Sequence, residues 1–118
     1  MEETINMTPI DVTNVDAFAE EIVKILDDRK AQNVQLIPVA DKTVIADYFI
    51  ICSGTSNTQV KGIAGELEYK LSERGVKAIR SEGYETGRWV VMDFASIIVH
   101  IFHHEEREFF KLEKLWEK

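Results

Sequence analysis

The stretch GRWVVMDFASIIVHIF, residues 87–102, decides the fold because it contains two apolar runs joined by a short Ala-Ser connection. Runs of this kind, rich in β-branched and aromatic residues and separated by so few positions, predict an antiparallel β-hairpin. An indole, a carboxylate and an imidazole, at Trp89, Asp93 and His100, stand among these apolar residues. Their function depends on which face of the sheet they occupy.

Strand alternation divides the hairpin into two sets, because successive strand residues point to opposite faces. One set is wholly apolar and consists of Val90, Met92, Phe94, Ile97, Val99 and Ile101. The other is aromatic with isolated polar groups and consists of Trp89, Val91, Asp93, Ile98, His100 and Phe102. We expect helices to cover the first set. The second set predicts either an interaction surface, since large exposed apolar patches mark binding sites, or a face that a further helix also covers, with Asp93 and His100 hydrogen-bonded at its margin.

The first half of the chain predicts a helix followed by two strands. Residues 14–31 place apolar side chains at three- and four-residue spacings, which predicts a helix that Thr13 can cap. Residues 33–40 predict a strand, and Pro38 favours a sheet edge or a bulge because proline cannot donate a ladder hydrogen bond. The apolar run at 48–53 is typical of a strand covered on both faces.

The second half predicts a helix, three strands and a last helix. Ser56 and Gln59 have the spacing of a capping box, and Gly75 ends the helix that they begin. A strand at 77–82 precedes the hairpin, and residues 103–118 read as a helix. On that helix we expect a Glu108–Lys111 charge pair and one apolar side formed by Phe109, Leu112 and Trp116. The order αββαβββα predicts a mixed five-stranded sheet with packed helices, in the α/β or α+β class.

Composition sets limits on the domain and its partners. A chain of 118 residues with 45% hydrophobic content fits a short tail at 1–12 and one domain at 13–118. The net charge of −7 argues against binding to a phosphate backbone, which needs clustered cations, and favours a basic partner. We expect neither a secretory signal nor a membrane span, and the single Cys52 suits a reducing compartment.

Five separate stretches closely resemble the Iojap-like ribosomal silencing factor family. They are ADYFIICSGTS at 46–56, NTQVKGIA at 57–64, SEGYETGRWVVMDF at 81–94, IIVHIF at 97–102 and EEREFFKLEKLW at 105–116. The resemblance implies a fold related to nucleotidyltransferases, without demonstrated catalysis, cofactor or metal. It also implies binding to the large ribosomal subunit through ribosomal protein L-fourteen, which obstructs joining of the small subunit and lowers translation when nutrients are scarce.

The resemblance further implies which residues recognise the partner and where the protein works. Partner recognition falls on Trp89, Asp93 and His100, with neighbours Glu82, Tyr84, Val91 and Phe102. Trp89 would be the apolar anchor, Asp93 and Glu82 would accept hydrogen bonds from Lys or Arg, and His100 would either contact the partner or orient Asp93. A homodimer of the free protein is compatible with the same surface. The chain shows no basic amphipathic transit segment, so we expect a ribosome-associated protein of a bacterial cytoplasm.

Three chemical alternatives remain at this point. A nucleotidyltransferase-like enzyme or nucleotide-binding protein is suggested by SGTS at 53–56 with Glu66 and Glu68, but these two carboxylates lie in a helical pattern, where residues two apart do not share a face. Metal binding by His100, His103 and His104 is disfavoured because His100 and His103 have opposite strand parity. A nucleophilic Cys52 is disfavoured because apolar surroundings oppose thiolate formation.

Overall fold

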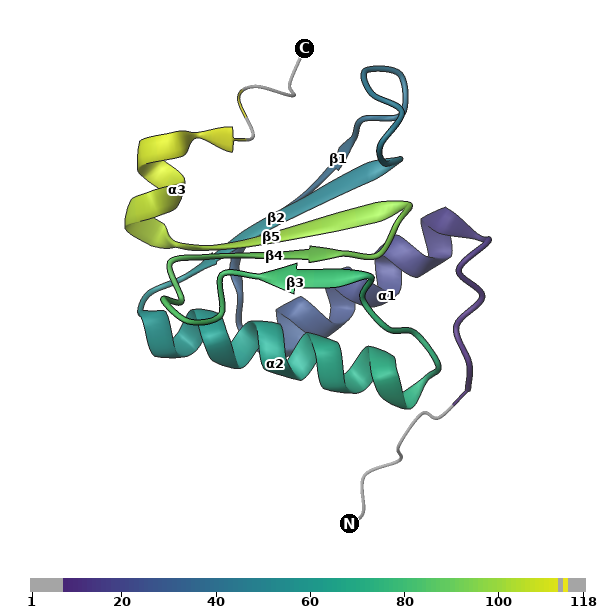
Figure 1. Ribbon diagram of the computed structural model, residues 1–118, viewed down its shortest axis with the longest axis horizontal. Helices are drawn as coiled ribbons and strands as arrows, with labels where there is room; N and C mark the ends of the chain where they lie inside the picture. Colours follow the sequence, from purple (N-terminus) through teal and green to yellow (C-terminus); the bar gives the residue numbers. More distant parts are fainter. Residues whose placement is uncertain (1–7, 113, 115–118) are drawn as a thin grey trace.

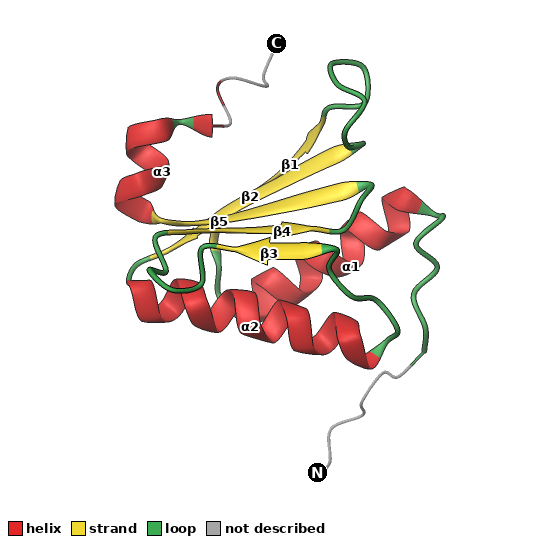
Figure 2. Ribbon diagram, viewed as in Figure 1, coloured by secondary structure: helices red, strands yellow, loops and turns green. Residues whose placement is uncertain are grey.

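A five-stranded mixed sheet forms the centre of the protein, and the computed structural model describes residues 8–112 and 114. The predicted order αββαβββα is confirmed. The elements are α1 (Val15–Asp28), β1 (Gln32–Pro38), β2 (Tyr48–Gly54), α2 (Asn57–Glu73), β3 (Arg80–Glu82), β4 (Trp89–Asp93), β5 (Ile97–His103) and α3 (His104–Phe110). The fold is therefore of the α+β class (Figures 1 and 2).

The strands follow the order β1-β2-β5-β4-β3 across the sheet. β2 and β5 are parallel neighbours, and all other neighbouring strands are antiparallel. β1 is an edge strand with an irregularity between Gln32 and Gln35, which confirms the edge position that Pro38 predicted. Helices α1 and α2 lie on one face of the sheet, while α3 stands on the opposite face over one end of it (Figure 1).

The hairpin of β4 and β5 has the predicted antiparallel pairing. Its turn is closed by the backbone N–H of Phe94, which donates to the carbonyl of Ile97 at 2.9 Å. Ala95 adopts a positive φ of 73°, and its N–H donates to Asp93 Oδ1 at 2.8 Å. The carboxylate of Asp93 therefore stabilises a turn that places an L-residue in the left-handed region.

The main hydrophobic core lies between the sheet and helices α1 and α2. All six residues of the wholly apolar hairpin set are buried in it, so the predicted assignment of that set to the helix-covered face is confirmed. Their partners from the two helices include Phe18, Ile22, Leu26, Ile63 and Leu67. Burial of these side chains supplies most of the driving force for folding, at about 25 cal/mol per Å² of apolar surface.

The helix termini differ in detail from the sequence prediction. Asn14, and not Thr13, caps α1, because its side chain accepts from the N–H of Ala17 at 3.2 Å. Ser56 caps α2 as predicted and accepts from the N–H of Gln59 at 3.0 Å. The Gln59 side chain does not complete the reciprocal capping bond to Ser56, since it accepts from the preceding residue Thr55 instead.

Residues 8–12, which the sequence assigned to a tail, are fastened to the domain; residues 1–7 lie outside the described part of the chain. The side chain of Arg74, the residue after α2, donates from Nε to the carbonyl of Thr8 at 2.8 Å. The backbone carbonyl of Arg74 accepts from the N–H of Ile10 at 3.2 Å. Its Nη1 also lies 2.8 Å from Glu21 Oε1 on α1. Arg74 thus joins the N-terminal segment, α1 and the end of α2.

At the other end of the chain, the Glu108–Lys111 pair is confirmed at 2.9 Å. The backbone turns at Lys111, whose φ of 48° is left-handed. The side chain of Phe109 and the whole of Trp116 lie outside the described residues, so the predicted apolar side of this helix is represented only by Leu112. No helix in the described ranges is both long and apolar enough to cross a bilayer.

We expect Arg74→Met to lower the free energy of unfolding by about 1–3 kcal/mol, because the Thr8 carbonyl and the partly buried Glu21 carboxylate lose the guanidinium as their partner. The matched control is Lys70→Met, which removes the exposed pair with Glu66 and is expected to cost less than about 0.5 kcal/mol. Urea denaturation measures both values. Equal losses in the two variants would show that Arg74 does not fasten the N-terminal segment.

Candidate partner-binding face

The sheet face that points away from α1 and α2 carries the second hairpin set. We call it the open face. It is built from neighbouring strands whose register aligns their side chains, and its residues are Phe49 and Ile51 of β2, Ile98, His100 and Phe102 of β5, and Trp89, Val91 and Asp93 of β4. Trp89 lies opposite Phe102 and Val91 lies opposite His100, which confirms the predicted parity. A small core of its own, which includes Phe49, Ile51 and Phe102, holds this face together.

Trp89 and His100 form the polar centre of this aromatic cluster. The indole Nε1–H donates to His100 Nδ1 at 3.2 Å. The Trp89 ring also stacks on Phe102, with ring centroids 4.7 Å apart. Because Nδ1 accepts this bond, the neutral imidazole carries its proton on Nε2. The indole is therefore held in one orientation by both a hydrogen bond and ring stacking.

His100 is a buried, neutral histidine. It is only 7% exposed, and burial lowers its pKa to about 4 because the low-dielectric surroundings disfavour the imidazolium. Within the described residues, its Nε2 has no hydrogen-bond partner. The Phe49 ring lies 5.0 Å from the imidazole, between centroids. Of the two roles expected for His100, contact with the partner or orientation of Asp93, the second is not what the structure shows, since the imidazole accepts its hydrogen bond from Trp89.

Helix α3 covers one end of the open face. The sequence predicted either an exposed interaction surface or a face covered by a further helix, and each of these descriptions holds for part of the face. The Phe110 ring lies 5.1 Å from Trp89, and Leu112 packs against the small core of this face. Trp89 is nevertheless half-buried and not enclosed, as are Val91, Asp93 and Ile98. The half of the face near the hairpin turn lies away from α3 (Figure 1).

Polar contacts anchor α3 at this position. His103 caps the helix, because its Nδ1 accepts from the N–H of Glu105 at 3.1 Å. Arg88 binds Glu106 at 2.6 Å and Glu105 at 3.5 Å, close to where β4 begins. The buried Arg107 donates to Ser53 Oγ at 3.3 Å. These contacts fix the start of α3 against the end of the sheet that carries Trp89.

Several sequence-predicted site residues occupy positions that differ from the prediction. Tyr84 does not lie on the open face: it packs against the helix-side core, and its hydroxyl lies 3.4 Å from Glu68 on α2. The ring of Phe102 is completely buried and cannot contact a partner directly. Glu82 is exposed on β3 opposite Val91, and it lies 3.9 Å from Arg80. Trp89, Val91, Asp93 and Glu82 thus remain accessible together.

Sequence reasoning missed two aromatic members of the cluster. Phe49 stands inside a continuous apolar run, which hides the alternation that would assign it to one face. Phe110 lies in a Phe-Phe pair, and helical periodicity assigned the apolar side to its neighbour Phe109. Contact of Phe110 with Trp89 depends on the angle between α3 and the sheet, which no local pattern specifies.

The residues that suggested nucleotidyl transfer, a nucleophilic cysteine or a metal site are either far from one another or already engaged in contacts within the protein. Glu66 and Glu68 both lie on α2, where Glu66 pairs with Lys70 at 3.5 Å and Glu68 lies beside Tyr84. Cys52 is buried in the helix-side core, and burial raises the pKa of its thiol to about 12. The parts of the chain that the structure describes contain no group of three potential metal ligands.

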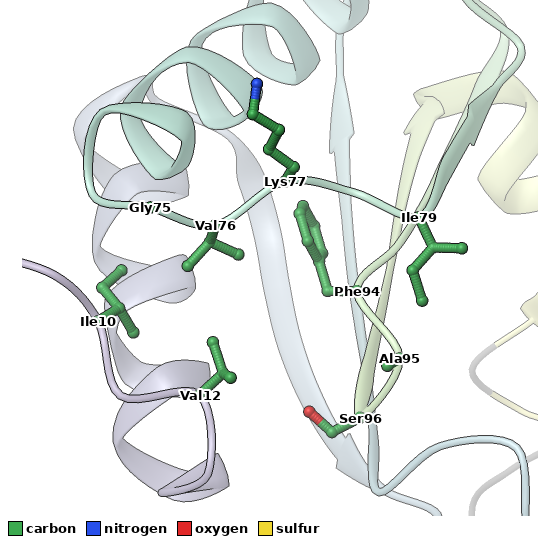
Figure 3. A pocket seen from close by; sticks show the side chains of 9 residues that line it. All are labelled: Ile10, Val12, Gly75, Val76, Lys77, Ile79, Phe94, Ala95 and Ser96. Carbon is green, nitrogen blue, oxygen red and sulfur yellow. The ribbon is translucent and has the colours of Figure 1, made fainter.

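A hollow on the side of the sheet opposite the open face is lined mainly by apolar residues. Acidic, thiol and metal-ligating side chains are not among its lining residues. This cavity of about 450 Å³ lies between the N-terminal segment, the loop after α2 and the β4–β5 turn (Figure 3). Ile79 and Phe94 are among its lining residues, and the ammonium group of Lys77 points away from the others. The polar and aromatic groups that could recognise a partner are therefore concentrated on the open face.

The fold and the open face define a small α+β domain with one helix-covered sheet face and one aromatic face that is only partly covered. The family model described as "Ribosomal silencing factor during starvation" matches residues 12–118. The chain belongs to this family of ribosomal silencing factors, which confirms the resemblance in its sequence.

Relatives of known sequence and structure agree with this assignment. The chain is 45% identical over 94 residues to the ribosomal silencing factor RsfS of Halalkalibacterium halodurans, with 80% of each chain covered. It is 39% identical over 90 residues to the factor of the same name from Bacillus subtilis, with 76% of each covered. A crystal structure of a Bacillus halodurans protein superposes with a TM-score of 0.78 at 40% identity, covering 86% of this chain and 94% of that one. The family name denotes a regulatory role in ribosome silencing and translation.

We expect the stability of the protein to fall with acidification through His100. The folded-state pKa of about 4 lies below the ordinary value of 6.5, so the unfolded chain binds the proton more readily between these pH values. At pH 5 this difference destabilises the fold by about 2 kcal/mol relative to pH 7.5. Urea denaturation of the wild type and of His100→Gln at both pH values measures the effect.

The exposed His104→Gln variant is the control and is expected to keep the full pH dependence. Carboxylate titration contributes equally to all three proteins and cancels in the comparison. If His100→Gln loses as much stability as the wild type on acidification, His100 is not the buried neutral group described above.

Proposed function

We propose that this chain binds the large ribosomal subunit through ribosomal protein L-fourteen and thereby blocks association with the small subunit. The observation that carries the proposal is a partly exposed Trp89, held by His100 and Phe102 on the open face of a ribosomal silencing factor. The factor acts as a steric block. Translation falls as a result, under the nutrient limitation that the family description names as starvation.

Four residues would contact the partner directly. Trp89 supplies the apolar anchor, a role in which tryptophan is enriched at interfaces, and Val91 extends the apolar surface beside it. Asp93 and Glu82 supply carboxylates for Lys or Arg of the partner, and charge-assisted hydrogen bonds of this type are the stronger ones. Because the indole is already held in place, docking costs little side-chain entropy at this position.

His100 and Phe102 act as positioning residues. Both are buried, so their contribution reaches the partner through Trp89: one accepts the indole hydrogen bond and the other stacks on the ring. Tyr84 has no part in this face, since it packs on the side of α2. The contact surface is therefore narrower than the residue pattern predicts.

Charge supports a basic protein as the partner. The chain has a net charge of −7, which attracts a cationic ribosomal protein and repels the exposed phosphates of ribosomal RNA. Electrostatic complementarity of this kind speeds association and selects among partners. This balance fits a ribosome-associated protein of a bacterial cytoplasm that touches protein rather than nucleic acid.

No chemical step is needed for this function. An interface of about 800 Å² on each partner is sufficient for stable binding, and the bulk of a domain at the joining surface prevents association of the subunits. The two glutamates that suggested nucleotidyl transfer lie on one helix with protein partners of their own. We therefore propose a regulator without catalysis or cofactor.

The proposal is tested with purified ribosomal subunits, whose association is followed by light scattering with and without the protein. The native protein is expected to inhibit joining, and Trp89→Ala is expected to weaken binding to the large subunit by about 30-fold, which equals about 2 kcal/mol. The control is Tyr69→Ala, which truncates an exposed aromatic residue on α2.

Trp89→Ala is expected to weaken binding and Tyr69→Ala is expected to leave it unchanged, because of these two residues only Trp89 lies on the open face. Subunit joining that is unaffected by the native protein would refute the silencing mechanism. Equal weakening by both variants would remove the open face from the interface and leave the mechanism to another surface.

The free protein is proposed to use the same face for self-association. A second copy would compete with the ribosome, because both need the Trp89 end of the sheet. Sedimentation equilibrium of the native protein and of Trp89→Ala measures this, and we expect a dimer for the first and a monomer for the second. A dimer in both would place self-association elsewhere.

A further inference from the structure

The loop between β1 and β2 presents two aliphatic side chains to solvent. Val44 is fully exposed and Ile45 is 61% exposed. Hydrogen bonds order the loop: the N–H groups of Lys42 and Thr43 donate to the carbonyl of Val39 at 2.9 and 3.0 Å. The N–H of Ile45 donates to Thr43 Oγ1 at 3.2 Å. The exposed pair is thus part of a defined turn, although it contributes nothing to either core.

The base of this loop belongs to the open face. Val39 and Ala46 are buried in the small core of that face, together with Phe49. The N–H of Asp47 donates to the carbonyl of Ser96 at 2.7 Å, which ties the loop to the turn of the hairpin. Figure 1 shows the loop rising from the sheet on the same side as α3, at the opposite end. Val44 and Ile45 therefore flank the half of the face that α3 leaves uncovered.

We propose that Val44 and Ile45 form a second apolar contact for the same basic ribosomal protein that docks on Trp89. This inference rests on the proposed function and extends its surface along the sheet. The partner would lie along the open face, from the loop beside the hairpin turn to Trp89 near α3. The loop residues then contribute to affinity and to the orientation of the partner.

Charge around the loop favours this occupant over an acidic or purely apolar one. Asp41 and Asp47 are exposed within the loop, and Asp93 lies at the adjoining turn. The single cation of the loop is Lys42. An aliphatic pair beside carboxylates suits a surface on which Lys or Arg surrounds apolar side chains, because both features then find complements.

The dimensions also fit one interface. β5 has seven residues, which corresponds to about 23 Å of strand from one end of the face to the other. A contact patch of ordinary size, about 800 Å² on each partner, extends over such a distance. One partner can therefore reach Trp89 and the loop at the same time.

The test compares the double variant Val44→Ser/Ile45→Ser with Ile79→Ser, a matched control that is 64% exposed and lines the hollow on the other side of the sheet. Binding of each protein to purified large subunits, and to purified L-fourteen, is measured by titration. We expect the double variant to bind about tenfold more weakly or worse, and the control to bind as the wild type does. Urea denaturation verifies that both variants keep the stability of the wild type.

The outcomes separate this inference from the function on which it rests. If the wild type binds and the double variant binds within twofold of it, the loop is not a contact and the inference is overturned while the proposed function stands. If the wild type binds neither the large subunit nor L-fourteen, both the inference and the proposed function are overturned. If the double variant keeps binding but loses self-association by sedimentation, a second copy of the chain occupies the loop, which also overturns the inference.

Discussion

The antiparallel pairing of β4 with β5 is the constraint on which the rest of the structure depends. Its register places six apolar side chains on one face, where α1 and α2 bury them, and puts Trp89 beside His100 and Phe102 on the other. A shift of one residue in either strand would exchange the faces. The core and the candidate site are therefore set by the same hydrogen-bond ladder, and neither can change without the other.

The open face is a compromise between stability and availability. A sheet covered on both faces would hide Trp89, whereas a fully bare aromatic face would promote nonspecific association. The short helix α3 covers one end only and is anchored there by Arg88 and Arg107, while Phe110 contacts the indole. The result is a tryptophan side chain that is held in place by its neighbours and still reachable, as the proposed docking requires.

Charged and apolar side chains are distributed unevenly over the open face. The open face includes the polar pair Trp89 and His100, and the buried imidazole stays neutral. Carboxylates such as Glu82 lie instead at exposed positions. Charge at the margin and aromatic surface at the centre suit the proposed docking of a basic partner on an apolar anchor.

Local patterns in the sequence determined the order of the elements, the edge position of β1, the cap at Ser56 and the parity of the hairpin, because each depends on spacings of a few residues. They also determined that Trp89, Asp93 and His100 share one face. Only the tertiary structure decided how exposed these residues are, that Tyr84 belongs to the side of α2, and that His100 binds Trp89 rather than Asp93. The reason is that exposure and side-chain partners depend on how helices such as α3 are placed over the sheet. That placement follows from contacts between residues far apart in the chain, such as Arg107 with Ser53, which no local spacing encodes.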